Sequence, residues 1–201
     1  MQVGEVIGGS ITDLLVQVRA TAETCWPINF GAFIKIKGQN NEIVGVVVDA
    51  RYETLMKARP TSRWIKERKT FHKIYPDIHE KFLSLAEVFV LGYAEKDASH
   101  QVLPPAPPEM HSPVMSMSDE EIKGFHKVDA EKQQVKIDYI YRLIGELPMG
   151  RCIDLLRAIV DRLEAFGLAR DAVVREISGA YMALGEEEVA LKVSSLLLRG
   201  R

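Results

Sequence analysis

The spacing of apolar residues changes once along this chain, and that change limits the possible folds more than any other feature. Up to about residue 93, apolar and polar residues alternate with the period of two that is typical of half-buried strands. From Ser118 onward, apolar residues recur every three or four positions, as in amphipathic helices. Strands followed by helices predict an α+β fold rather than a doubly wound α/β sheet.

The alternating part contains four clear strand-like runs, separated by turns rich in Gly and Asn. In "GAFIKIKG" (31–38), Ile34 and Ile36 share one face and Phe33 lies on the other face with two lysines. Four or five such strands predict a small antiparallel β-barrel. The other runs are "LLVQV" (14–18), "EIVGVVVDARY" (42–52) and "LAEVFVLGY" (85–93).

The domain organisation follows from two changes in composition. The barrel is predicted over residues 1–101. Within it, the charged, basic insertion 54–83 is predicted to be a long loop with at most one short helix. "VLPPAPPEMHSP" (102–113) holds five of the nine prolines. Proline fixes φ and removes a hydrogen-bond donor, so residues 102–117 are predicted to be a stiff, extended connector.

Residues 118–201 are predicted to form a bundle of helical hairpins. "SDEE" (118–121) is typical of a helix N-terminus, with Ser118 as the cap and Glu121 at the third helical position. The apolar positions then predict two antiparallel hairpins whose apolar groove could receive a partner segment. Their four helices are expected at about 135–147, 153–166, 173–184 and 189–197.

Composition favours an ordinary globular protein. A domain that coats nucleic acid over its whole surface is strongly basic, whereas this chain has a net charge of -2. Cys25 and Cys152 have no paired spacing, which predicts neither a disulfide framework nor a thiolate metal site. No apolar run approaches the ~18 residues that a membrane span needs. A cytoplasmic location without membrane contact is expected.

The Gly8-Gly9 pair at the end of the first strand invites comparison with a phosphate-binding loop. Such a loop needs a following helix with Lys and Ser or Thr at its N-terminus, and no Gly-Lys-Ser/Thr occurs in this chain. An alternating strand follows instead, so Gly8 and Gly9 are predicted to supply positive φ in a tight hairpin turn.

In order and spacing, several of these stretches resemble the N-terminal HAS-barrel of HerA-type DNA translocases. They are "VGEVIGGSITD", "GAFIKIKG", "VGVVVDARYE", "AEVFVLGY" and "LPPAPPEMHSPVMSMSDEEIKGF", which together cover roughly residues 2–125. In that family the connector leads into a RecA-like ATPase core, whereas here helical sequence follows it.

The resemblance implies a barrel that associates with like barrels, and therefore a homo-oligomer with a protein partner such as a HerA-like ATPase or a nuclease. The family's catalytic residues belong to the ATPase core, so the resemblance assigns none of them here. We expect a non-catalytic accessory or adaptor protein in a DNA-processing complex, with no cofactor and no metal.

One basic segment gives the alternative hypothesis of a nucleic-acid-binding module. Cations displace counterions from phosphates and aromatic rings stack on bases, so the composition of residues 57–73 suits DNA contact. The other interpretation is a solvated loop between two strands. The candidate residues are Lys57, Arg59, Arg63, Trp64, Lys66, Arg68, Lys69 and Lys73.

Two further groups of polar residues do not predict a metal site or a catalytic site. His72 and His79 are seven residues apart, which fits neither a helix-face pair nor a zinc knuckle. Asp49, Arg51 and Glu53 alternate along a strand, so their side chains share a face and are expected to form solvated ion pairs. The sequence therefore predicts a binding protein rather than an enzyme.

Overall fold

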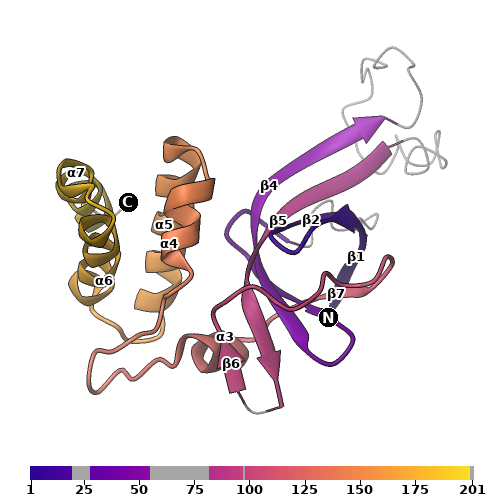
Figure 1. The fold of residues 1–201 in the computed structure, drawn as a ribbon, viewed down its shortest axis with the longest axis horizontal. Helices are drawn as coiled ribbons and strands as arrows, with labels where there is room; N and C mark the ends of the chain where they lie inside the picture. Colours follow the sequence, from indigo (N-terminus) through magenta and orange to yellow (C-terminus); the bar gives the residue numbers. More distant parts are fainter. Residues whose placement is uncertain (20–27, 55–81, 97, 200–201) are drawn as a thin grey trace, which may run out of the picture.

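The computed structural model describes residues 1–19, 28–54, 82–96 and 98–199. In its first part, these residues form seven antiparallel strands. Six of them close into a barrel in the order β2-β1-β7-β3-β4-β5, because β5 also pairs with β2. The sixth strand in chain order, β6, pairs with β5 outside this ring (Figure 1). The strands are β1 (Gln2–Gly9), β2 (Asp13–Val18), β3 (Phe33–Lys37), β4 (Glu42–Thr54), β5 (Phe82–Glu95), β6 (Ala98–His100) and β7 (Pro113–Ser116).

The predicted antiparallel barrel is confirmed, but its closing strand lies in the predicted connector. Strand β7 joins β1 to β3, pairing Val114 with Gly4 on one side and with Ile36 on the other. Pro113 is the first residue of β7, a position where a strand tolerates the missing N–H. The proline-rich segment therefore ends as part of the barrel.

The hairpin between β1 and β2 is also confirmed, but only one glycine of the pair has a positive φ. Gly9 has a φ of 127°, and a Cβ there would lie 2.3 Å from the carbonyl oxygen of Asp13. A Cβ on Gly8 would meet no atom within 4 Å. Gly8 instead follows a register shift in the β1–β2 ladder.

We expect Gly9→Ala to lower the free energy of unfolding by roughly 1–3 kcal/mol, because alanine disfavours this backbone conformation and its Cβ would collide with the opposite strand. Gly8→Ala is the matched control, and we expect it to change the free energy by less than about 0.5 kcal/mol. Urea denaturation of the two variants makes the comparison. Equal effects would contradict this assignment of the turn.

The barrel interior is a closed aliphatic core. Inward-facing side chains such as Ile34 and Ile36 are fully buried, as their alternation predicted. The outer face of β4 and β5 is buried as well, because Val46 and Phe89 pack in a second core together with the helices. Burial on both faces explains why β4 is apolar from Ile43 to Val48 and β5 from Val88 to Gly92.

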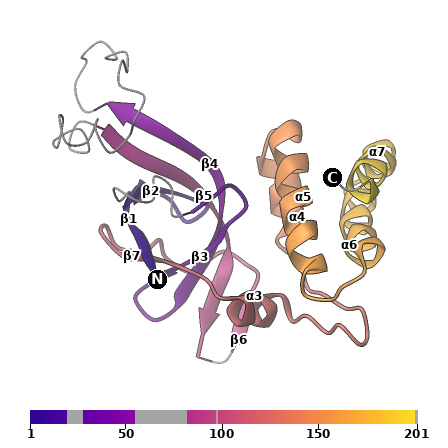
Figure 2. The ribbon, with the colours of Figure 1, turned by 180° about the vertical axis from the view of Figure 1, so that it is seen from behind.

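Five helices follow the barrel in the described part of the chain. Figures 1 and 2 show α4 and α5 between the barrel and the outer pair α6 and α7. Leu143 of α4 and Leu156 of α5 belong to the same buried core as Val46 and Phe89. The helices are α3 (Asp119–His126), α4 (Ile140–Glu146), α5 (Met149–Glu164), α6 (Arg170–Ala183) and α7 (Glu187–Leu198). None of the described helices combines the length and apolar character needed to span a membrane.

The helix start at Ser118 is confirmed as a capping box. The Glu121 N–H donates to Ser118 Oγ at 3.3 Å, and the Ser118 N–H donates to Glu121 Oε2 at 2.8 Å. The helix predicted from residue 135 is wrong at its start, since α4 begins at Ile140. The backbone of residues 136–138 is held by the side chain of Gln101 instead. Its amide nitrogen donates to the Lys136 carbonyl, and its amide oxygen accepts from the Asp138 N–H.

Candidate functional site

The predicted nucleic-acid residues Lys57, Arg59, Arg63, Trp64, Lys66, Arg68, Lys69 and Lys73 lie outside the described residues, as do His72 and His79. The nucleic-acid site therefore stays a prediction. Strand β4 ends and β5 begins beside this segment, and Figure 1 shows these strand ends projecting beyond the barrel.

Of the residues predicted to pair along β4, Arg51 and Glu53 do so, whereas Asp49 pairs with Arg151 of α5 instead. Arg51 Nε lies 2.9 Å from Glu53 Oε1, and the Arg51 guanidinium also pairs with Glu87 of β5. These two carboxylates raise the pKa of Arg51. Arg151 of α5 adds contacts of 3.7 Å to Asp49 and 3.6 Å to Glu87.

Sequence reasoning missed two members of this ion-pair set, Glu87 and Arg151. Glu87 lies opposite Asp49 in the β4–β5 register, a pairing that no local pattern reveals. All the carboxylates of this set are matched by guanidinium groups at a partly exposed surface. The set thus joins β4, β5 and α5, and it offers no isolated acid or base for catalysis.

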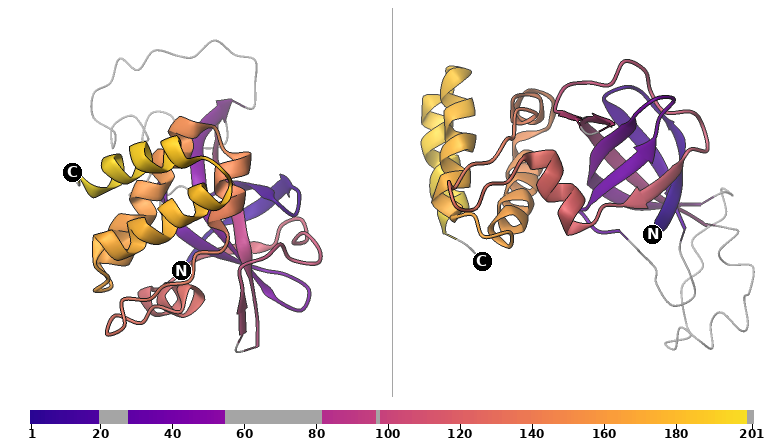
Figure 3. Two further views of the ribbon diagram at one scale, coloured as in Figure 1. Left: turned by 60° about the vertical axis from the view of Figure 1, so that its left-hand side comes forward. Right: turned by 90° about the horizontal axis from the view of Figure 1, so that it is seen from below.

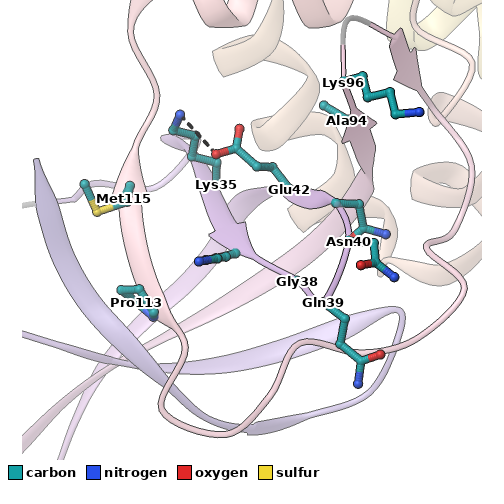
Figure 4. A pocket seen from close by; sticks show the side chains of 11 residues that line it. Lys35, Gly38, Gln39, Asn40, Glu42, Ala94, Lys96, Pro113 and Met115 are labelled. Carbon is teal, nitrogen blue, oxygen red and sulfur yellow. Dashed lines mark ion pairs between the residues drawn. The ribbon is translucent and has the colours of Figure 1, made fainter.

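An open polar cavity lies at the other end of β4, where three connections of the barrel meet (Figure 4). It has a volume of about 680 Å³. The β3–β4 turn, the β5–β6 hairpin and the start of β7 form its walls. Its lining residues are Lys35, Lys37, Gly38, Gln39, Asn40, Asn41, Glu42, Ala94, Lys96, Pro113 and Met115.

Local chemistry fixes the shape of the β3–β4 turn. The Gly38 N–H donates to the Asn41 carbonyl at 2.8 Å. A Cβ on Gly38 would lie 2.2 Å from Asn41 Oδ1, so a larger residue at position 38 would require the Asn41 side chain to move. On the facing β5–β6 hairpin, Lys96 has a left-handed φ of 53°. The turn that the sequence predicts at Gln39-Asn40-Asn41 is thereby confirmed.

The three lysines of the cavity differ in their partners. Lys35 Nζ lies 2.5 Å from Glu121 and 3.5 Å from Glu42. The hydrogen bond to Glu121, with the charge of Glu42, raises the pKa of Lys35, while Lys35 lowers the pKa of Glu121. Lys37 and Lys96 form no ion pair with any residue that the structure describes. Both side chains line the cavity.

A smaller cavity of about 170 Å³ adjoins the first between the β5–β6 hairpin and α3. The two cavities share four lining residues and are together called the basic groove. Met117, Phe125 and Val44 give the smaller cavity an apolar wall. The shared residues are Lys35, Glu42, Ala94 and Lys96.

The chemistry of the basic groove is that of a binding surface. It offers ammonium groups, side-chain amides and apolar contacts such as Met115. Its carboxylates, Glu42 and Glu121, are already paired with Lys35. An anionic ligand that also carries an apolar group would satisfy both parts of the groove.

A buried polar cluster between α3 and the segment that follows it has a structural role. His126 Nδ1 donates to the Ile122 carbonyl, and His126 Nε2 accepts from the Tyr139 hydroxyl, both at 2.8 Å. Burial lowers the pKa of His126 to about 4 and raises the pKa of Tyr139. His126 is therefore neutral near pH 7. The surrounding apolar pattern gave no signal for this cluster.

No group of three or more His, Cys, Asp or Glu residues suited to a metal ion occurs among the described residues. Cys152 is buried beside the Tyr181 hydroxyl, 3.8 Å away, and its burial raises the pKa of the thiol. A raised pKa makes the thiol a poor nucleophile, and Cys152 packs in the core that the helices share. Cys25 lies outside the described residues.

Comparison with known proteins relates the whole arrangement to one family. The model of a family described as "Domain of unknown function (DUF8166)" matches residues 2–178. This match runs from β1 through the barrel and α3 to α5 into α6. No curated protein matches the chain. With its six-strand antiparallel barrel and following helices, the chain belongs to the DUF8166 family.

Proposed function

We propose that this protein is a non-catalytic accessory component that assembles with a HerA-like ATPase or a related DNA-processing complex. The sequence resemblance to HAS-barrels supports this role, since the resembling stretches fall on β1, β3, β4, β5 and β7 in the same order. A closed antiparallel barrel of six strands is compatible with that identity.

The observation that carries the proposal is how the surfaces of the barrel are occupied. Its interior is filled by aliphatic side chains such as Ile34 and Val88. Its outer face at β4 and β5 is covered by the helices. The basic groove at the barrel end stays accessible, and its charges suit the acidic surface of a partner protein.

The test is direct binding to the purified HerA-like ATPase encoded in the same genome, measured by sedimentation velocity. We expect Lys37→Glu with Lys96→Glu to weaken the complex at least ~10-fold, because like charges then face the partner. Lys127→Glu with Lys132→Glu is the matched control, since both lysines are exposed and outside the groove. Absence of any complex, or equal loss in both variants, would contradict the proposal.

The alternative of a nucleic-acid-binding module rests on residues 57–73, which lie outside the described residues. A DNA affinity that falls steeply with salt and depends on Arg63, Lys66, Arg68 and Lys69 would favour that alternative.

A further inference from the structure

We propose that the basic groove receives the α6–α7 turn of a second copy of this chain, so that copies join head to tail. This inference rests on the proposed function of the groove as a protein contact and names one partner for it. The groove supplies two cations, Lys37 and Lys96, that form no ion pair with any described residue, and apolar contacts at Ala94, Pro113 and Met115. The occupant must therefore combine negative charge with exposed apolar side chains.

The α6–α7 turn has both properties within seven residues. Met182 and Leu184 are about half exposed, at 52% and 48%. Gly185 then reverses the chain with a φ of 79°. The next three residues are the exposed carboxylates Glu186, Glu187 and Glu188. Of these, Glu188 pairs with Lys192, whereas Glu186 and Glu187 form no ion pair with any described residue.

The two surfaces complement each other in charge. Lys37 and Lys96 at the groove rim match Glu186 and Glu187 at the turn, and none of these four side chains forms an ion pair with any described residue. The remaining groove charges sum to -1, since one lysine, Lys35, is held between two glutamates, Glu42 and Glu121, which leaves the described lining with a net charge of +1. The apolar side chains that precede the glutamates would contact Met115 and its neighbours. Such a contact buries apolar area and pairs charges, as standard interfaces do.

The arrangement of the fold makes this a contact between molecules. Figures 1 and 3 show α6 and α7 at the end of the molecule away from the barrel, with α4 and α5 between. These helices share one buried core with the outer face of β4 and β5, which fixes their place. A contact between two different surfaces is heterologous, so repeated copies form a ring or an open chain.

A nucleic-acid strand fits the groove less well than this acidic turn. The larger cavity carries Glu42 beside its lysines, and this negative charge opposes phosphates and carboxylates alike. None of the described residues that line this cavity is aromatic, so it offers no ring on which a base could stack. A nucleic-acid strand would also leave the apolar side chains of Pro113 and Met115 without an apolar contact.

The test uses two charge-reversed variants of the full chain and sedimentation equilibrium. Groove variant Lys37→Glu with Lys96→Glu keeps an acidic turn, and turn variant Glu186→Lys with Glu187→Lys keeps a basic groove. We expect each variant alone to associate roughly 100-fold more weakly than the wild type. An equimolar mixture should associate again, because the intact groove of one variant meets the intact turn of the other.

The complementation separates a head-to-tail contact from all others. A contact between two identical surfaces would not be restored by mixing. Asp171→Lys with Glu176→Lys is the control, since it reverses two exposed carboxylates of α6 away from the turn, and it should leave association unchanged. Unchanged thermal unfolding of each variant shows that the fold is retained.

Three results would overturn this inference: a wild-type protein that stays monomeric at every soluble concentration, a mixture that does not associate, or binding of the groove to a duplex DNA probe instead. Binding of the HerA-like ATPase to a monomeric wild type would overturn the self-contact but leave the proposed function standing. Normal self-association without ATPase binding would overturn the proposed function but leave the self-contact standing.

Discussion

Replacing Arg142 by alanine is expected to lower the free energy of unfolding by about 3 kcal/mol, because it removes the main polar contact between helix α4 and the barrel. The guanidinium donates to the Val90 carbonyl at 2.9 Å and to the Leu91 carbonyl at 2.7 Å. It also lies 5.7 Å from the centre of the Phe89 ring. The side chain is partly buried, and this burial lowers the pKa of Arg142.

The position of these carbonyls explains the size of the effect. In the β4–β5 ladder, Val44 pairs with Gly92 and Gly45 with Val90, so Leu91 is an extra residue without a partner. Arg142 therefore satisfies an acceptor that the register shift leaves unpaired. In Arg142→Ala, two partly buried carbonyls would lose charged donors, and α4 would lose this contact with the barrel.

Urea denaturation at pH 7 measures this loss, and two variants interpret it. Arg142→Lys should recover less than half of the stability, because an ammonium group cannot reach both carbonyls as the planar guanidinium does. Arg175→Ala removes an exposed arginine whose pair with Asp171 is 3.5 Å long, and it should cost less than about 0.5 kcal/mol. A similar cost for Arg142→Ala would show that the contact is dispensable.

Acidification from pH 7 to pH 4 is expected to remove about 3 kcal/mol of stability through His126 alone. Burial holds its folded pKa at about 4, whereas the unfolded residue titrates near 6.5. Between these values the unfolded chain binds a proton that the folded chain does not. Stability is thus fully present above about pH 6.5 and is lost as the pH falls toward the folded pKa.

The free energy of unfolding at pH 7, 6 and 5 shows this slope and its source. His126→Phe should be less stable at pH 7, since the Tyr139 hydroxyl loses its acceptor, but its stability should depend less on pH. His111→Gln is the control, because the His111 ring is 68% exposed, and it should keep the wild-type slope. An unaltered slope in His126→Phe would rule out His126 as the source.

Local sequence patterns predicted the elements whose cause is local. The alternation in β3 predicted Ile34 and Ile36 inside the barrel, and Ser118 with Glu121 predicted the start of α3. The start of α4 could not be predicted in this way. Residues 135–139 have a helical apolar pattern, but Gln101, from outside the helical part, binds the backbone there.

The candidate groove was beyond sequence reasoning for a similar reason. Its turn at Gln39-Asn40-Asn41 was recognisable, but none of its lysines stood out among the 26 basic residues of the chain. Lys37 and Lys96 come together only because β4 pairs with β5 and brings the tips of two hairpins side by side. The basic segment that did stand out lies outside the described residues.

By itself, the sequence determined the fold class, the sidedness of the strands and the capping of α3, because side-chain periodicity and capping act within a few residues. Only the tertiary structure decided that β7 closes the barrel, that the helices cover β4 and β5, and that Lys35 is neutralised by Glu121, 86 positions away. Such contacts depend on which surfaces meet after the chain has folded, and many pairings of similar strands satisfy the same local pattern.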